Sequence, residues 1–175
     1  MTEATSLAES VSGPAAGGGT DPAAASLQWA VRDSLLRYVL VIAHGTCATD
    51  GGVTMDESGV FGFGLRSATE VSDGEWRLSF AGSVRFTAHH GFLDILIEDP
   101  TVDIGPQGGV LSATTGGGRT AIARLGAAVP GRDGDRLVWP AIGSELLESA
   151  VETFGGVYPA GTEMAPLALH VPLTS

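Results

Sequence analysis

The segment GSVRFTAHHGFLDILIEDP, residues 82–100, constrains the fold of this chain most strongly. Apolar and polar residues alternate in both of its halves, which is typical of β-strands that bury one face. The apolar positions are Val84 and Phe86 in the first half and Leu93, Ile95 and Ile97 in the second. His89, His90 and Gly91 lie between the halves, and the glycine permits the positive φ that a tight turn often requires. The segment therefore predicts a β-hairpin whose histidine pair is either a solvated tip or a point of contact with a ligand.

Shorter alternating segments continue this pattern along the chain. Further strands are expected over residues 27–31, 60–65, 75–81, 102–104, 110–113, 120–129, 137–139 and 167–171. Turns rich in glycine separate several of them, and residues 45–59 are expected to form a loop. Many short strands of this kind predict a mainly β fold, either an antiparallel β-sandwich or a partly closed barrel.

Two short α-helices are expected to accompany the strands. The first covers residues 32–42, although the β-branched residues at its end could equally return it to strand. Its apolar stripe consists of Leu35, Tyr38, Val39 and Ile42. A tyrosine on that stripe needs a hydrogen-bond partner for its hydroxyl if it is buried. The second helix covers residues 144–154, with Ser144 as its N-cap and a Gly-Gly pair after its end.

Length and composition limit the class of protein. The 175 residues suit one folded domain, which we place at residues 27–175. Residues 1–26 are mostly Ala, Gly, Ser, Thr and Pro, so they predict a disordered leader, and they lack the features of a secretory signal. Nine basic and twenty acidic residues give a net charge of −11, which disfavours binding to nucleic acid or to anionic lipid.

Neither a membrane segment nor a disulfide is expected. No apolar run approaches the roughly 20 residues that a membrane helix needs. Cys47 is the single cysteine, so an intrachain disulfide is excluded, and no base accompanies it in sequence to make it a nucleophile. Because neither a signal peptide nor a membrane anchor is visible, the sequence predicts a cytoplasmic location.

Several motifs occur in an order that resembles the HtaA family, the haem-binding conserved-region domains of Gram-positive haem-uptake systems. The motifs are Trp29; Ser34-x-x-x-Tyr38-Val39; Gly82-x-Val84-x-Phe86-x-x-His89-x-Gly91-x-Leu93-Asp94; Pro100; and Phe154-Gly155-x-x-Tyr158-x-Ala160-Gly161. The resemblance covers about residues 27–173. The chain departs from the family at Leu35, where an aromatic residue is usual, and at Ala165, where an acidic one is usual. Neither departure removes a residue expected to bind a ligand.

The resemblance implies both a fold and a ligand. It implies an antiparallel β-sandwich with short helices that binds haem b in its ferric form. By motif position, Tyr38 would hold the haem iron, His89 would hydrogen-bond that tyrosine, and Tyr158 would also contribute to the site. Members of the family are usually secreted or displayed on the cell surface.

The residue types suit this chemistry. A phenolate is a hard anionic ligand that favours ferric iron, and tyrosine is a known haem ligand. A free phenol has a pKa of about 10, so ionisation near neutral pH needs the metal and a neighbouring hydrogen-bond donor, here His89. Apolar walls are expected from Phe61, Phe63, Trp76, Phe86 and Phe92. A haem propionate is expected to pair with Arg37 or Arg85.

Three classes of function follow from the sequence. The first is a non-enzymatic haem-binding protein for haem transfer, uptake or storage, which would exchange haem with a donor or acceptor protein. The second is a haem-dependent, peroxidase-like enzyme in which His90 or His44 acts as acid–base. The third is an interaction β-sandwich that has lost the ligand. No zinc or calcium site is expected, because adjacent histidines in a strand point to opposite faces.

Overall fold

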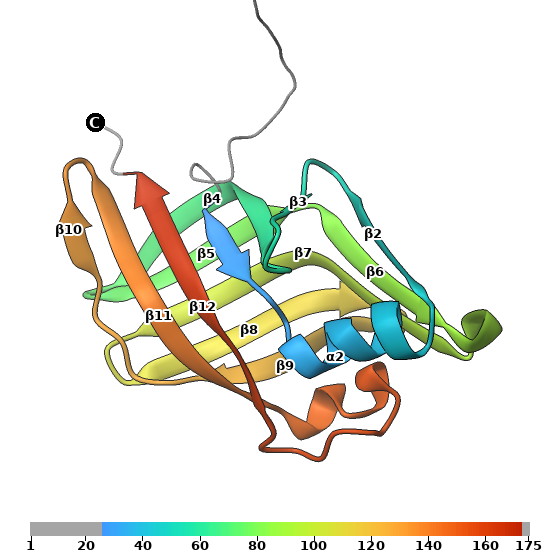
Figure 1. The fold of residues 1–175 in the computed structure, drawn as a ribbon. Helices are drawn as coiled ribbons and strands as arrows, with labels where there is room; N and C mark the ends of the chain where they lie inside the picture. The colour runs from blue at the N-terminus through green and yellow to red at the C-terminus, as the bar shows by residue number, and fades with distance from the viewer. Residues whose placement is uncertain (1–25, 173–175) are drawn as a thin grey trace, which may run out of the picture.

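The computed structural model describes residues 26–172. Within this range the chain is mainly β, and twelve strands join into one antiparallel sheet (Figure 1). The strands are β1 (Leu27–Trp29), β2 (Thr46–Asp50), β3 (Thr54–Met55), β4 (Phe61–Ser72), β5 (Glu75–Ala81), β6 (Ser83–Ala88), β7 (Leu93–Gly105), β8 (Gly108–Thr115), β9 (Gly118–Leu125), β10 (Gly131–Asp133), β11 (Arg136–Leu146) and β12 (Glu163–Pro172). The predicted antiparallel β fold is confirmed.

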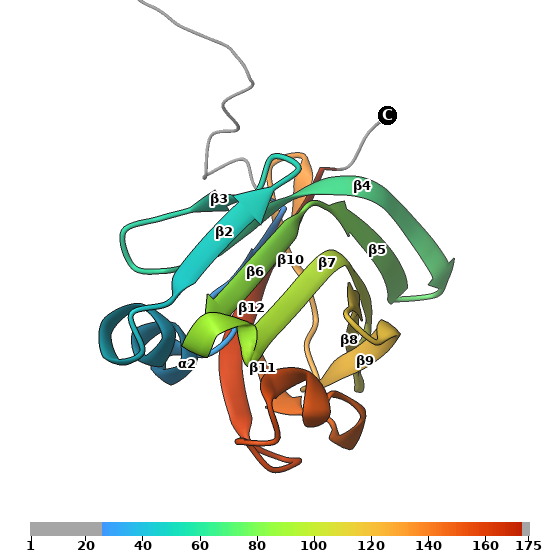
Figure 2. The same cartoon turned by 90° about the vertical axis from the view of Figure 1, so that its right-hand side faces the viewer.

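Eight of the strands close into a barrel because β7 pairs with β5 as well as with β8. The closed path runs β7-β5-β4-β1-β12-β11-β9-β8 and returns to β7. β6 and β2 extend the sheet beyond β7, while β3 pairs with β4 and β10 with β11. Figure 2 shows the strands curving around a common interior. Of the two predicted architectures, sandwich and barrel, the chain therefore adopts the barrel.

The inward faces of the strands form one hydrophobic core. In the segment that opened the sequence analysis, Val84, Phe86, Ile95 and Ile97 are all buried, so the predicted alternation is confirmed. The largest fully buried side chains are Trp29, Trp139, Phe61, Phe63, Phe80, Phe86 and Phe154. Burying a large apolar side chain is worth roughly 1.5–3 kcal/mol, which makes this core the main source of stability.

Two successive strands, β5 and β6, pair with different halves of β7, and the sheet bends between them where Gly82 lies opposite Asp99. Gly82 has a φ of +111°, which favours glycine, and a Cβ added there would collide with the side chain of Val53. The Asp99 N–H donates to the Gly82 carbonyl at 2.8 Å, and the Asp99 carboxylate accepts the Gly82 N–H at 3.1 Å. From this pair of hydrogen bonds, β6 and the first half of β7 run to one end of the molecule, where the turn η4 (His89–Gly91) projects (Figure 1).

The first predicted helix is present in two parts. An α-helical turn, α2 (Asp33–Arg37), continues directly into a π-helical turn, η3 (Tyr38–Ile42). The Ala43 N–H donates to the Tyr38 carbonyl at 2.8 Å, the wider spacing of a π-turn. No helix within residues 26–172 is long and apolar enough to cross a membrane.

The second predicted helix is wrong at its start. Ser144 belongs to β11, and its buried hydroxyl donates to the Ala165 carbonyl at 2.8 Å instead of capping a helix. Ile142, Ser144 and Leu146 are buried in alternation, so pairing with β9 and β12 outweighs the helical stripe. Only two 3₁₀ turns follow, η5 (Glu148–Ala150) and η6 (Glu152–Phe154).

The predicted loop over residues 45–59 is also wrong in part. It contains the edge strand β2 and the short strand β3. The β2 residues are mostly exposed and carry no apolar alternation, so their strand conformation comes from pairing with β6 rather than from a local pattern.

The predicted disordered leader lies almost entirely outside the described residues. Its last residue, Ser26, belongs to the folded body: its N–H donates to Phe63, and its carbonyl accepts from His170. We expect a chain that begins at Ser26 to melt within a few degrees of the full chain and to bind the same ligand, because the leader is too rich in small and polar residues to bury much surface. Thermal unfolding of both chains tests this, and a large drop in melting temperature would show that the leader packs on the body.

Candidate functional site

A tyrosine and a histidine that are distant in sequence meet at one end of the barrel. The Tyr38 hydroxyl lies 2.6 Å from His89 Nε2, within hydrogen-bond distance. The two ring centroids are 5.8 Å apart and the ring planes are tilted by 52°. Tyr38 opens the π-helical turn η3, and His89 opens the turn η4 between β6 and β7. The structure therefore contains the hydrogen bond that the resemblance implies.

The local structure keeps this tyrosine accessible. Leu35 and Val39, one helical turn apart, are buried and fix α2 and η3 against the core. Tyr38 is 37% exposed and Ile42 is 63% exposed, so the predicted apolar stripe is correct only for Leu35 and Val39. The wider π-turn changes the angular spacing of the side chains after Tyr38, which a regular helical repeat does not describe.

The histidine turn adopts an uncommon backbone conformation. His89 and His90 have φ values of +54° and +57°, in the left-handed region that few non-glycine residues adopt, although Asn, Asp and His adopt it more often than the others. The two residues therefore lie in a turn and not in a strand, which corrects the reason given above for keeping their side chains apart. Strained backbone of this kind is concentrated at ligand sites and switches, where surrounding structure holds it in place.

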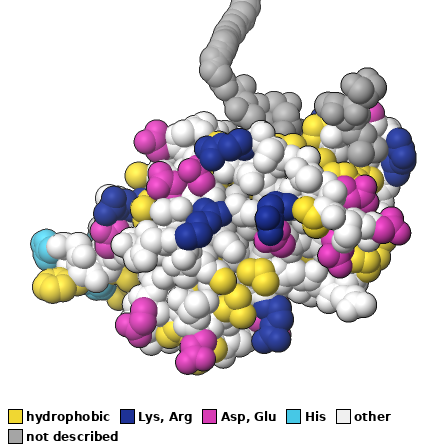
Figure 3. All heavy atoms as spheres, turned by 180° about the vertical axis from the view of Figure 1, so that it is seen from behind, with side chains coloured by type: hydrophobic (Ala, Val, Ile, Leu, Met, Phe, Trp, Pro, Cys, Tyr) yellow, Lys and Arg dark blue, Asp and Glu magenta, His cyan; other side chains and the backbone are white. Residues whose placement is uncertain are grey.

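Exposed apolar side chains accompany the Tyr38–His89 pair. Val41 and Ile42 of η3 are 62% and 63% exposed, and Phe92, directly after η4, is 91% exposed. Figure 3 shows hydrophobic and histidine side chains together at one end of the molecule. Large exposed apolar groups gathered near one polar pair are typical of a binding surface. The sequence analysis placed Ile42 on the apolar stripe and made no prediction for Val41, so it identified neither as a surface residue.

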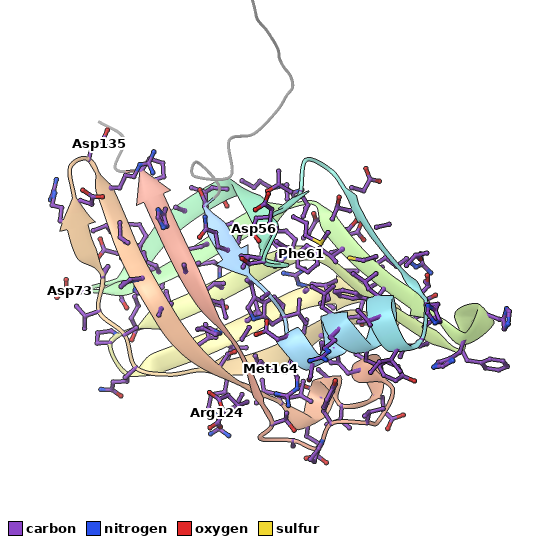
Figure 4. All side chains as sticks on the ribbon, viewed as in Figure 1. Asp56, Phe61, Asp73, Arg124, Asp135 and Met164 are labelled. Carbon is purple, nitrogen blue, oxygen red and sulfur yellow. The ribbon has the colours of Figure 1, made fainter. Side chains whose placement is uncertain are left out.

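Three predicted wall residues, Phe61, Phe63 and Phe86, lie in the core instead, and a fourth, Trp76, is partly buried against it. Phe61, which Figure 4 labels, and Phe86 are fully buried. Their rings meet edge to face with centroids 5.8 Å apart. Neither ring borders open surface, so both support the strands rather than form a wall. Strand alternation correctly predicts that these rings face inward, but it does not distinguish a filled core from a pocket.

The second predicted site tyrosine has a different neighbour. The Arg32 guanidinium carbon lies 5.0 Å from the centroid of the Tyr158 ring, a cation–π contact. Arg32 also donates to the Glu163 carbonyl. Tyr158 is half-buried and packs against the core, and among the described residues it forms no hydrogen bond or ring contact with Tyr38 or His89.

The two arginines considered for a propionate have different surroundings. Arg85 donates two hydrogen bonds to the Asp94 carboxylate, at 2.8 and 2.7 Å, which raises the pKa of Arg85 and lowers the pKa of Asp94. The pair persists until the pH falls through that lowered Asp94 value. Arg37 is exposed, one residue before Tyr38, and forms no ion pair in the part of the chain described here. Arg37 is therefore the arginine left available beside the tyrosine.

Other potential reactive groups are unfavourably placed. Partial burial raises the pKa of the Cys47 thiol, which disfavours the reactive thiolate. Residues 26–172 contain no group of three or more His, Cys, Asp and Glu side chains placed to hold a bare metal ion. The chemistry of the site thus rests on the phenol, its imidazole partner and the surrounding apolar surface.

Solved structures resemble the whole barrel. The C-terminal domain of HtaA from Corynebacterium glutamicum is 25% identical, with a TM-score of 0.76 over 85% of this chain and 95% of that domain. The N-terminal domain of the same protein is 22% identical, with a TM-score of 0.73 over 86% of this chain and 97% of that domain. HtaB from the same organism, described as a haem-binding protein, is 21% identical, with a TM-score of 0.68 over 84% of this chain and 91% of HtaB.

The family assignment comes from sequence as well as fold. No match to a curated protein was found. The HtaA family model matches residues 24–170, which cover the barrel up to the last two residues of β12 and include both partners of the Tyr38–His89 hydrogen bond. The chain therefore belongs to the HtaA family.

Proposed function

We propose that this protein binds ferric haem, with the Tyr38 oxygen as the iron ligand and His89 as the hydrogen-bond partner of that oxygen. The observation that carries the proposal is the 2.6 Å contact between the Tyr38 hydroxyl and His89 Nε2 on an accessible surface. The family assignment and the description of HtaB as a haem-binding protein support the same ligand class.

The tyrosine–histidine pair suits an anionic ligand. With a proton on Nε2, the His89 imidazole donates to the Tyr38 oxygen and stabilises the phenolate; with the other tautomer, Nε2 accepts from the phenol. Tyrosine binds ferric iron as its phenolate, and haem would supply that iron as the Lewis acid. A hydrogen bond from the neighbouring histidine fixes the ring and the charge in the required place.

The surface around the pair fits a flat apolar ligand. The side chains of Val41, Ile42 and Phe92 expose large apolar areas to solvent. Covering apolar surface contributes roughly 25 cal/mol per Å², so a porphyrin placed over these side chains would gain stability without a deep cavity. A ligand held by one iron bond at an accessible surface is suited to transfer, uptake or storage, in exchange with a haem-donating or haem-accepting protein.

The direct test is a titration of the purified protein with hemin. We expect saturable binding, a shifted Soret band and a charge-transfer band of ferric haem with a phenolate ligand. Peroxide turnover at the level of free hemin would agree with a binding role and not with a peroxidase. A protein that leaves the hemin spectrum unchanged would exclude haem as its ligand.

Substitutions of His89 and His90 should distinguish the roles of these two adjacent residues in haem binding. His89→Ala removes the partner of the Tyr38 oxygen but leaves the iron ligand, so we expect about tenfold weaker haem binding and a shifted charge-transfer band. His90→Ala, which removes no hydrogen bond to Tyr38, should leave the affinity of this site and its band unchanged. Equal damage from both substitutions would show that the turn acts as a whole rather than through His89.

The arginine variants should identify the propionate partner. Arg37→Gln removes an exposed cation next to Tyr38, so we expect about threefold to tenfold weaker haem binding. Arg85→Gln breaks the pair with Asp94 and should leave haem affinity within about twofold of the wild type. Both affinities are measured by hemin titration at low salt, and the reverse ranking would assign the propionate to Arg85.

A further inference from the structure

A separate cavity opens beside the histidine turn. Its volume is about 590 Å³, and its lining consists of Ala43, His44, Gly45, Thr46, Thr87, Ala88, His89, His90, Gly91 and Phe92. Three of the four histidines of the chain line it, whereas Tyr38 does not. We call it the histidine cavity. Its lining contains no carboxylate and no arginine, so an imidazole is the strongest metal-binding group that it offers.

All three histidines of the cavity have strained backbones. His44, His89 and His90 have φ values of +51°, +54° and +57°. For His89 this conformation accompanies the hydrogen bond to Tyr38. The side chains of His44 and His90 are exposed and have no hydrogen-bond partner among the described residues, so they contribute nothing to holding their own left-handed backbone. Residues with strained backbone are concentrated at ligand sites, so three of them around one cavity indicate a binding site.

The surrounding structure holds His44 in place. The Gly45 N–H donates to the Val39 carbonyl at 2.6 Å, and a Cβ added at Gly45 would collide with the Thr87 carbonyl, so only glycine fits there. The Thr46 and Thr87 hydroxyls are 2.6 Å apart and bond to each other. One threonine hydroxyl therefore donates to the other, and the imidazoles are the stronger metal-binding groups of this lining.

The character of the lining selects the ligand class. Imidazole nitrogens bind iron, zinc and copper, but a bare ion requires three or four protein ligands, and residues 26–172 do not assemble such a group. Haem brings four nitrogen ligands of its own and needs only one or two from the protein. The small residues of the lining, Ala43, Gly45, Ala88 and Gly91, let a flat molecule approach the backbone closely.

We propose that the histidine cavity is a second, weaker haem site, in which His44 or His90 supplies an imidazole ligand to the iron. The proposal rests on the proposed function, since it takes haem as the cargo of this protein. His89 borders both sites, because its Nε2 meets the Tyr38 hydroxyl while the residue lines the cavity. Haem bound at the cavity is therefore placed to reach, or to leave, the Tyr38 site.

The experiment compares hemin titrations of five proteins: the wild type, the His44→Gly/His90→Gly double variant, Tyr38→Phe, the triple variant that combines them, and His170→Gln as control. Glycine accepts the left-handed conformation without strain, so the double variant is expected to fold. His170 lies on β12 and does not line the cavity. Soret absorbance gives the stoichiometry, and spectra after reduction with dithionite report imidazole-ligated ferrous haem.

We expect the wild type and the control to take up two equivalents of haem, the second about tenfold or more weakly than the first. The double variant should take up one equivalent with unchanged affinity. Tyr38→Phe should keep only the weaker equivalent, with an imidazole spectrum after reduction, and the triple variant should lose it. A wild type that binds one equivalent overturns the second site alone, and so does a double variant that still takes up two. A second equivalent lost in the double variant together with a Tyr38→Phe variant identical to the wild type would instead overturn the Tyr38 site.

Discussion

Tyr38→Phe is expected to weaken ferric haem binding at the main site by about 100-fold or more while leaving the barrel intact. The substitution removes one oxygen and keeps the ring, and Tyr38 is partly exposed, so little packing is lost. The phenolate charge-transfer band should disappear with the oxygen. Hemin titration measures the affinity, and a thermal melt of the ligand-free protein measures the stability.

Tyr158→Phe is the matched control, because Tyr38 and Tyr158 are the only tyrosines of the chain. The Tyr158 ring lies under the Arg32 guanidinium, and this contact needs the ring rather than the hydroxyl. We expect at most about tenfold weaker haem binding and an unchanged charge-transfer band. A lost band in Tyr158→Phe together with an unchanged band in Tyr38→Phe would assign the iron to Tyr158.

Phe86→Ala is expected to cost about 3–5 kcal/mol of unfolding free energy, the usual cost of removing a fully buried aromatic ring. The ring packs edge to face against Phe61, and the substitution would leave a cavity in the core. Denaturant unfolding at equilibrium measures the loss. A loss of this size can exceed the margin of stability of a small domain, so Phe86→Leu, which keeps most of the volume, provides the folded variant for haem binding.

Phe86→Leu is expected to bind haem with wild-type affinity and spectrum, because the ring supports the strands and does not line the site. Phe92→Ala, at a 91% exposed position, should show the opposite behaviour: unchanged stability and weaker haem binding. A stable Phe86→Leu variant with an altered haem spectrum would show that Phe86 lines the haem site, as the sequence analysis expected.

The strands could be predicted from sequence because each leaves a local signal, whereas the tyrosine–histidine pair was predicted from the resemblance to a family. Alternation at Val84, Phe86 and Ile95 gives the hairpin, and these residues are buried as expected. Tyr38 and His89 were paired through the resemblance to the HtaA family, since nothing in composition or spacing brings together two residues so far apart. Their hydrogen bond is present, whereas their roles in haem binding stay a prediction.

Other features leave no local signal. The edge strand β2 takes its conformation from its partner β6, and Ser144 follows the pairing of β11 rather than its own preference for capping. The π-helical turn at Tyr38 and the left-handed φ of His44 arise from contacts made after the chain has folded. Whether the inward ring of Phe61 meets a core or a pocket depends on how the opposite strands close.

The most direct measurement is resonance Raman spectroscopy of the ferric haem complex, excited in its charge-transfer band, with ring-deuterated tyrosine incorporated into the protein. We predict phenolate ring modes that shift on deuteration in the wild type, persist in Tyr158→Phe and vanish in Tyr38→Phe. A complex whose spectrum shows imidazole ligation and no mode sensitive to tyrosine deuteration would contradict the assignment of Tyr38 as the iron ligand.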